Sequence, residues 1–277
     1  MKYYQDKELL KELYEAHKSY DKVAEILGCN YKTVARWMKK FDIANVGTQG
    51  ARKRNLNHDY FEEINTEEKA YWLGFLYADG CVYRGSGSYS YRLQINLQAR
   101  DRIILEKFQS AIESNYKIQE KKVNNADCVL LKVNSTKMCE DLMNLGVVPR
   151  KSLICTFPKL RSDLIPHFIR GYFDGDGCIT RTESRGKWGI NICGNQAFLT
   201  SMQNIFKEND ILVNIYDNNH SVAKTLETGS HVMISKLYDF LYKNATVYLE
   251  RKYEKFQAFM SEQANVPLQS NLFDITG

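Results

Sequence analysis

The 277-residue chain lacks several features that would place it in common protein classes. It has no secretory signal and no apolar run long enough to cross a membrane, so neither export nor membrane insertion is expected. Its four prolines are too few for a proline-rich linker. It also contains no glycine-rich phosphate loop and no nucleophile triad. An enzyme acting on small molecules is therefore the least favoured class.

The seven cysteines are scattered, and no two of them form a CxxC pair. Their odd number and mostly apolar neighbours predict reduced, buried thiols in a cytoplasmic protein. A hydrophobic fraction of 44% with 12% aromatic residues is sufficient for packed cores, and the length suits a small domain plus a larger one. The net charge of +5 suits a polyanionic partner, but on its own it is explained as simply by ordinary solubility.

Two short stretches, residues 72–80 and 169–177, look like copies of one another. The first reads Trp-Leu-Gly-Phe-Leu-Tyr-Ala-Asp-Gly, and the second reads Ile-Arg-Gly-Tyr-Phe-Asp-Gly-Asp-Gly. In each stretch two small residues four positions apart share one face of a predicted helix, which would let two such helices approach closely. The glycine that follows each helix, Gly80 or Gly177, is expected to form a left-handed C-terminal cap.

An aspartate ends each predicted helix, Asp79 in the first copy and Asp176 in the second. An anion at the negative end of a helix dipole destabilises the helix by about 0.3–1 kcal/mol, and helices packed side by side would also bring the two carboxylates together. A bound divalent cation is the simplest compensation, because hard cations prefer carboxylate oxygens. The alternative is an ordinary helix followed by a loop aspartate, which the second copy makes less favourable.

Residues 1–42 have the pattern of a small all-α helix-turn-helix domain. A predicted helix over residues 6–17 is followed by one that stops at Gly28 and by another that begins after Asn30, a favourable N-cap. In such modules the last helix enters the major groove of DNA. The residues expected to face outward from it are Tyr31, Lys32, Arg36 and Lys39.

Arg36 is suited to guanine and Lys32 to a phosphate, although a three-helix scaffold with a solvated basic face is the alternative. Residues 43–57 contain two glycines, a basic cluster and no periodicity, which predicts a basic linker. Its cluster either follows the DNA backbone or is simply solvated. The members of the cluster are Arg52, Lys53 and Arg54.

The segments that follow the two copies also match in order, which predicts two related half-domains over residues 58–152 and 153–262. Each half is expected to run helix, hairpin, helix, hairpin, helix. The unit of roughly 100 residues exceeds the usual solenoid repeat, so the halves are expected to be related by a pseudo-twofold axis. Residues 231–234 are taken as an extension of the second sheet, and residues 263–277 as a C-terminal tail.

The predicted strands alternate between apolar and polar residues. In residues 92–97 the apolar side chains share one face that would pack on helices, and the polar face would be free to meet a ligand. Antiparallel sheets with such a polar face can lie in a DNA groove, although a solvated face explains each single strand equally well. The candidates for DNA contact are Arg92, Gln94, Asn96, Lys117, Gln119, Lys121, Lys132, Asn134 and Asn191.

The two nine-residue motifs resemble the paired motifs of LAGLIDADG homing endonucleases in their single-chain form, over about residues 59–260. The resemblance implies an α+β fold of two pseudo-twofold-related αββαββα halves, whose antiparallel sheets form a saddle that binds double-stranded DNA. It implies a monomer that cleaves both strands. It also implies that Asp79 and Asp176 bind Mg²⁺ or another divalent cation such as Mn²⁺, with the carbonyl groups of Ala78 and Gly175 as neighbouring ligands.

One motif position departs from the family pattern, since its earlier acid is Tyr77 in the first copy and Asp174 in the second. That position is not usually a metal ligand in the family, so the departure does not put cleavage in doubt. The family also tends to place a lysine near each active centre. Aligning the two halves offers Lys132 as a catalytic residue and, less well, His231.

A site-specific, metal-dependent DNA endonuclease is therefore the favoured function. A non-cleaving transcription regulator on the same fold is one alternative, against which the retention of both aspartates argues. An RNA-splicing maturase is another, and only the helix-turn-helix pattern, typical of DNA-binding domains, separates it from the nuclease. No intein splice-junction residues are recognisable, which favours a free-standing enzyme.

Overall fold

The computed structural model describes residues 3–17, 19–43, 54–84, 90–149, 151, 154–182, 186–217 and 222–264. The chain forms two compact units, which divide after Arg54. Arg52 and Lys53, two of the three basic residues in the predicted linker, lie outside the described residues. Within the described ranges no helix is both long enough and apolar enough to span a membrane.

The first unit is a three-helix domain with a small core of its own. Its elements are η1 (Tyr3–Gln5), α1 (Lys7–His17), α2 (Tyr20–Ile26) and α3 (Tyr31–Lys40). Asn30 caps α3, because its side chain accepts a hydrogen bond from the backbone N–H of Lys32 at 2.9 Å. Gly28, in the turn between α2 and α3, has φ +59°, a conformation that glycine adopts without strain. The predicted helix-turn-helix is thus confirmed, including its N-cap.

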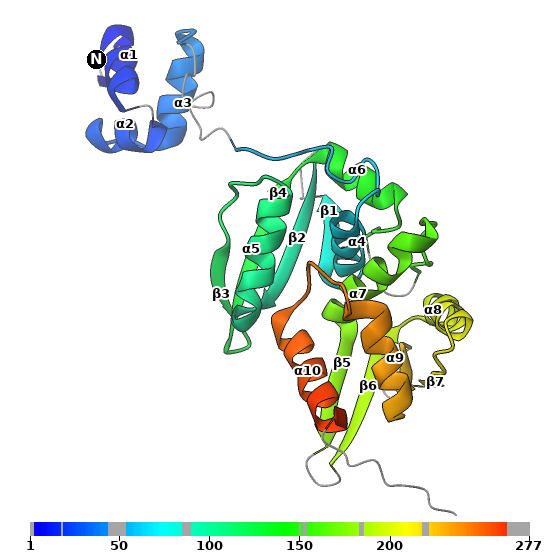
Figure 1. The fold of residues 1–277 in the computed structure, drawn as a ribbon. Coiled ribbons are helices and arrows are strands. Elements are labelled where there is room, and N and C mark those ends of the chain that lie inside the picture. The colour runs from blue at the N-terminus through cyan, green and yellow to red at the C-terminus, as the bar shows by residue number, and fades with distance from the viewer. Residues whose placement is uncertain are drawn as a thin grey trace, which may run out of the picture. The chain divides into compact units, whose positions relative to one another are not determined.

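The second unit contains two halves with the same order of elements (Figure 1). The first half comprises α4 (Glu67–Asp79), β1 (Gly80–Arg84), β2 (Tyr91–Gln98), η2 (Ala99–Asp101), α5 (Arg102–Ala111), β3 (Gln119–Val123), β4 (Ala126–Asn134) and α6 (Thr136–Asn144). The second half comprises η4 (Ser162–Leu164), α7 (Ile165–Asp176), β5 (Gly177–Thr182), β6 (Lys187–Gly194), α8 (Gln196–Glu208), β7 (Asn214–Asp217), β8 (Lys224–Thr228), α9 (His231–Tyr242) and α10 (Glu250–Ala264). Each half therefore has the predicted αββαββα order, and α10 follows the second.

Each half folds its strands into a four-stranded antiparallel sheet, in the order β1-β2-β4-β3 or β5-β6-β8-β7. Helices pack against one face of each sheet, α5 and α6 on β2 and α8, α9 and α10 on strands of the second sheet (Figure 1). In β2 the apolar residues Leu93, Ile95 and Leu97 are buried on the helix side, whereas Asn96 on the opposite face is exposed. The alternation predicted from the sequence is confirmed.

The prediction that residues 231–234 extend the second sheet is wrong, because these residues form the first turn of α9. Ser230 caps this helix, and its hydroxyl accepts a hydrogen bond from the backbone N–H of Met233 at 3.5 Å. Ile234, Leu237 and Leu241 then follow at helical spacing, and all three are buried. The cap and the period together determine the helix.

The seven cysteines form no disulfide bond, and all of them lie in described parts of the chain. The expected burial holds for Cys128, Cys139 and Cys155. It does not hold for Cys81 and Cys193, which are exposed because they lie on the uncovered faces of the two sheets.

Candidate active site

Helices α4 and α7 pack against each other through the two faces of small residues. A Cβ atom added to Gly74 would lie 2.9 Å from the backbone nitrogen of Tyr172, and one added to Gly171 would lie 2.8 Å from that of Phe75. Both distances are shorter than van der Waals contact, so only glycine permits this separation of the helices. The close approach predicted from the spacing of small residues is confirmed.

The glycines after the two helices are not left-handed caps, contrary to the prediction. Gly80 has φ −76° and ψ 141°, and Gly177 has φ −91° and ψ 164°, so both are extended and each begins a strand. A Cβ atom at either position would lie 2.6 Å from a carbonyl oxygen of the preceding helix, that of Leu76 or Phe173. Glycine is needed here because the strand leaves the helix end without a turn.

Asp79 and Asp176 are the last residues of α4 and α7. The two helix ends lie together, since a Cβ atom on Gly175 would be 3.1 Å from Asp79 Oδ2. Desolvation, followed by repulsion from Asp176, raises the pKa of Asp79 to about 6. Desolvation also raises the pKa of Asp176, although this residue remains exposed. The two acids are thus brought together in a place that disfavours their charged forms.

A buried lysine lies at the end of α4. The Nζ atom of Lys151 donates hydrogen bonds to the carbonyl oxygen of Ala78, at 3.1 Å, and to that of Gly80. These carbonyl groups belong to the residues on either side of Asp79. The ammonium group therefore caps the negative end of the helix and lowers the pKa of both Asp79 and Asp176, against the effect of desolvation.

Lys252 has the same role at the end of α7. Its Nζ atom donates to the carbonyl oxygens of Phe173 at 2.6 Å, Asp174 at 2.7 Å, Gly175 at 3.3 Å and Gly177 at 2.6 Å. The last two acceptors flank Asp176, as the acceptors of the first lysine flank its aspartate. Desolvation lowers the pKa of Lys252 to about 8, so its ammonium group is only moderately favoured at neutral pH.

The lysines at the helix ends are not the residues that the sequence offered. Lys132 lies in β4 opposite Gln94, and His231 begins α9 with its Nδ1 atom 3.0 Å from an amide oxygen of α10. The sequence does contain a signal for the two lysines at the helix ends. Lys151 and Lys252 each follow an arginine soon after the last predicted helix of a half. This repeated Arg-Lys pair is a signal in the sequence that could have pointed to them, although their contacts depend on tertiary structure.

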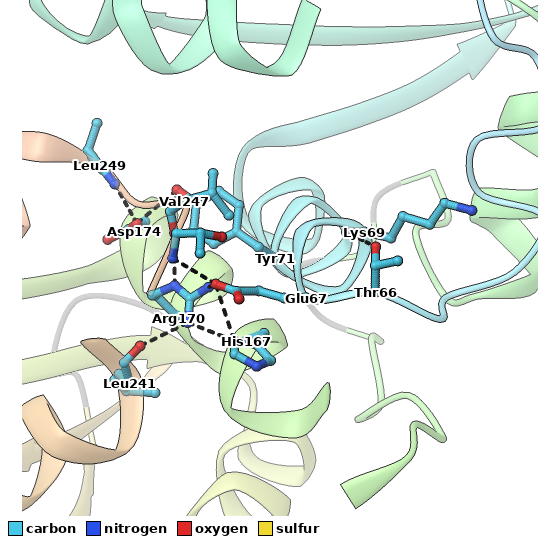
Figure 2. A network of polar contacts seen from close by, with 11 residues as sticks. Thr66, Glu67, Lys69, Tyr71, His167, Arg170, Asp174, Leu241, Val247 and Leu249 are labelled. Atoms are coloured by element: carbon cyan, nitrogen blue, oxygen red, sulfur yellow. Dashed lines mark hydrogen bonds and ion pairs between the residues drawn. The ribbon is translucent and has the colours of Figure 1, made fainter. Parts of the chain in front are cut away.

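Asp174, the acid at the variable motif position, holds Leu249 (Figure 2), which lies shortly before Lys252 in the chain. Its carboxylate accepts hydrogen bonds from the backbone N–H of Leu249 at 2.7 Å, from the hydroxyl of Tyr71 at 2.8 Å and from that of Tyr242 at 2.6 Å. The side chain is 1% exposed, so these donors compensate for the loss of water. The carboxylate of Asp174 is therefore occupied by donors from the protein itself.

Tyr77, at the same position of the first motif, makes the corresponding connection in the first half. Its hydroxyl donates to the carbonyl oxygen of Leu145, directly after α6. The chain then continues to Lys151. The two different side chains at this position therefore fulfil a similar role, which is to hold the segment that supplies the lysine.

Arg170 joins the two halves (Figure 2). Its guanidinium donates to Glu67 Oε1 at 2.8 Å, in α4, and to the carbonyl oxygens of Leu241 and Val247, both at 2.9 Å, in the second half. Arg170 is 1% exposed, and every one of these acceptors comes from a different element or loop. This network holds α4 against α7 and is structural.

The predicted DNA-contacting residues lie on two surfaces. Tyr31, Lys32, Arg36 and Lys39 are exposed on α3. In the second unit cross-strand pairing places Gln94 opposite Lys132 and Arg92 opposite Asn134, on the face of the sheet that no helix covers. The other candidates on the uncovered faces are Asn96 in β2, Gln119 and Lys121 in β3, and Asn191 in β6, and Lys117 is exposed directly before β3.

The carboxylates of Asp79 and Asp176 are the groups in this site that could hold a divalent cation. In the described residues no cluster of three or more His, Cys, Asp and Glu side chains is arranged to hold a metal, so the remaining ligands would be other oxygens. The carbonyl oxygens of Ala78 and Gly175 are nearby, and each already accepts a hydrogen bond from a lysine. Two adjacent carboxylates with raised pKa values fit a hard cation.

Two segments of the chain match known families. Residues 163–241 match the family described as a LAGLIDADG-like domain, and residues 3–44 match the family described as a helix-turn-helix domain. The chain thus carries a LAGLIDADG-like domain in its second unit and a helix-turn-helix domain in its first. No curated protein sequence matches the chain.

Solved structures similar to this chain include one of a meganuclease, I-SmaMI, and two of homing endonucleases. A mutant of I-SmaMI shares 12% identity, covers 73% of this chain and 92% of its own, and gives a TM-score of 0.50. The I-LtrWI LAGLIDADG homing endonuclease bound to target DNA has 13% identity, coverages of 76% and 92%, and a TM-score of 0.49. A mesophilic variant of the homing endonuclease I-DmoI has 18% identity, coverages of 68% and 94%, and a TM-score of 0.46. The first likeness supports the predicted fold.

Proposed function

We propose that the protein is a site-specific endonuclease that hydrolyses phosphodiester bonds in double-stranded DNA with the help of a divalent cation. The observation that carries the proposal is the placement of Asp79 and Asp176 side by side at the ends of α4 and α7. Stability alone does not favour this pair, since desolvation and mutual repulsion raise the pKa of Asp79 to about 6. A function that needs both carboxylates accounts for the arrangement.

The two carboxylates would hold Mg²⁺ or Mn²⁺, with the carbonyl oxygens of Ala78 and Gly175 next to them. When bound, such an ion polarises a phosphate and lowers the pKa of a coordinated water. Lys151 and Lys252 hold the main chain on both sides of the two acids and so fix the directions of the carboxylates. Their positive charges also reduce the repulsion that an approaching phosphate would experience from the acids.

Duplex DNA is the substrate that fits the surfaces of both units. The uncovered face of the first sheet carries Arg92, Lys121 and Lys132 among amide side chains, a combination that contacts phosphates and base edges. The helix α3 exposes Lys32 and Arg36, and such a helix can enter the major groove. Because the helix-turn-helix unit is linked to the second unit, it would bind neighbouring DNA at a high effective concentration.

The proposal is tested by incubating the protein with Mg²⁺ and a random-sequence duplex library, and by sequencing the cut ends. Asp79→Asn and Asp176→Asn are expected to lose cleavage by about two orders of magnitude or more, since each removes one acid of the pair. Asp239→Asn, an exposed change on α9, is the matched control and should cut like the parent. Cleavage at the parental rate by both active-site variants would refute the assignment. Tight duplex binding without cleavage in any divalent metal would instead indicate a regulator.

A further inference from the structure

The uncovered faces of the two sheets carry opposite charges at equivalent positions. In the first sheet Gln94 of β2 pairs with Lys132 of β4, and in the second sheet Asn191 of β6 pairs with Glu227 of β8. In both halves an amide side chain in the second strand thus faces a charged one in the fourth. The charge is positive in the first half and negative in the second.

The equivalence of the two positions is fixed by the neighbouring strands. On its other side Gln94 pairs with Cys81, and Asn191 pairs with Cys178. Each of these cysteines lies two residues after a motif aspartate, so each row of paired residues begins at the same place relative to a helix end. Glu227 therefore occupies the position in the second half that Lys132 occupies in the first, and both rows lead away from the candidate active site.

The difference in charge is not limited to Lys132 and Glu227 but holds for the two uncovered faces. Because side chains alternate between the faces of a strand, the pairing assigns each charged residue to one side. On the uncovered side the charged residues in the described strands of the first sheet are Arg92, Lys121 and Lys132. On the corresponding side of the second sheet, among the described residues, they are Lys187 and Glu227. The charges of these described residues cancel on the second face, so the described part of this face should depend less on phosphate attraction.

Glu227 helps to line a hollow of the second sheet. It pairs with Asn191 on one side and with Asn214 of β7 on the other. These three side chains, together with Thr180 and Tyr216, help to line a cavity of about 690 Å³ that opens on the uncovered face. Glu227 is partly buried, and the two amide side chains on the paired strands are hydrogen-bonding groups that suit the edge of a base.

The two charges suit different bases. A lysine donates to the O6 and N7 acceptors of guanine, whereas a carboxylate accepts from the N4 amino group of cytosine. A carboxylate on a DNA-binding face is also repelled by phosphates, which leaves base edges as its favourable partners. Two halves that read a palindrome would need the same side chain at equivalent positions, and here the side chains differ in charge.

We propose that Glu227 is a specificity-determining residue that selects cytosine on the second half's side of the target, whereas Lys132 selects guanine on the first half's side. The target is accordingly not palindromic at these two positions. This inference rests on the proposed function, because it takes duplex DNA as the ligand of the uncovered faces. It does not depend on cleavage.

The test selects bound duplexes from a random-sequence DNA library with the Asp79→Asn variant, so that no result depends on catalysis. With the Asp79→Asn variant alone, one position of the selected duplexes, on the second half's side, should be enriched in cytosine. Glu227→Gln should reduce this enrichment about tenfold, and Glu227→Lys should replace cytosine with guanine. Glu208→Gln and Glu208→Lys make the same charge changes at the exposed end of α8, in the helix layer of the same half, and should leave the selected sequence unchanged.

Lys132→Glu provides a second, independent variant in the other half, where guanine should give way to cytosine. Unchanged base preferences in the Glu227 and Lys132 variants would overturn the inference and leave the proposed function standing, because duplexes would still be recovered. Failure of every protein, including the Glu208 controls, to enrich any duplex would overturn the proposed function and the inference with it. Glu227→Lys should also make log Kd about one unit steeper against log salt concentration.

Discussion

Lys151 and Lys252 occupy equivalent places at the ends of α4 and α7, since each donates to the carbonyl oxygen before a motif aspartate and to that of the glycine after it. An ammonium group at the negative end of a helix dipole stabilises the helix and the neighbouring carboxylate together. Each half thus supplies one acid and one cation. The candidate site is assembled twice, once from each half, where the two helices meet.

Replacement of Lys252 by Met is expected to lower the free energy of unfolding by about 2 kcal/mol or more, because buried carbonyl groups lose their donor. Lys255→Met is the matched control in the same helix. It removes a single hydrogen bond, to the carbonyl oxygen of Ile179 at 3.2 Å, and should cost about 1 kcal/mol or less. Urea denaturation followed by circular dichroism measures both values. Equal losses would show that Lys252 has no special role in capping α7.

The two acids could be predicted from the sequence, whereas the two lysines could not. Asp79 and Asp176 belong to nine-residue motifs in which small residues, an acid and a glycine occur together, so a local pattern is sufficient. Lys151 and Lys252 reach the same helix ends only after two hairpins and two helices have folded between them. Their role depends on tertiary structure. The only trace of this role in the sequence is an Arg-Lys pair that occurs at the matching place in both halves.

The fold was predictable where neighbouring residues decide it. Alternation of apolar and polar residues identified β2, and repetition identified the two halves. The start of α9 was not predictable in this way, because residues 231–234 suit a strand as well as a helix until the cap at Ser230 is considered. Gly80 shows the same limit, since its role depends on contact with Leu76 rather than on its own conformational freedom.

Asp79→Asn is expected to stabilise the protein at neutral pH in the absence of divalent cations. The pKa of Asp79 is about 6 in the folded protein, above its ordinary value of 3.8, so the folded state binds this proton more tightly than the unfolded state. Its contribution to stability is therefore present below about pH 4 and is lost as the pH rises to about 6. At pH 7.5 the variant should exceed the parent by about 1–2 kcal/mol. The gain should vanish near pH 4.

Urea denaturation in EDTA at several pH values between 4 and 7.5 measures this difference. Asp239→Asn on α9 serves as the exposed control and should show no such pH dependence. Addition of Mn²⁺ at pH 7.5 should stabilise the parent more than Asp79→Asn, because under the proposed function the ion would bind the carboxylate that the variant lacks. A variant less stable than the parent at pH 7.5 in EDTA would show that the carboxylate is not destabilising.

Gly74→Ala is expected to lower the free energy of unfolding by about 3 kcal/mol, because the new methyl group would force α4 and α7 apart. The added Cβ atom would lie 2.9 Å from the backbone nitrogen of Tyr172, which belongs to a buried helix and cannot move aside alone. Gly229→Ala is the matched control. Its Cβ atom would lie 3.7 Å from the carbonyl oxygen of Trp188, an ordinary contact, so stability should change by less than about 0.5 kcal/mol. Similar urea midpoints for the two variants would contradict the close packing.

Arg36→Ala is expected to weaken DNA binding about tenfold or more, because α3 is the helix that we propose enters the major groove, and an exposed arginine there would contribute base or phosphate contacts. The helix-turn-helix belongs to a different compact unit from Asp79 and Asp176, so the chemistry at the acids should be unaffected. In cleavage assays KM should therefore rise while kcat stays at the parental value. Lys11→Ala removes an exposed positive charge from α1 of the same unit and should change KM much less. Equal KM values for the two variants would mean that α3 is not the DNA-reading helix and that its basic face is only solvated.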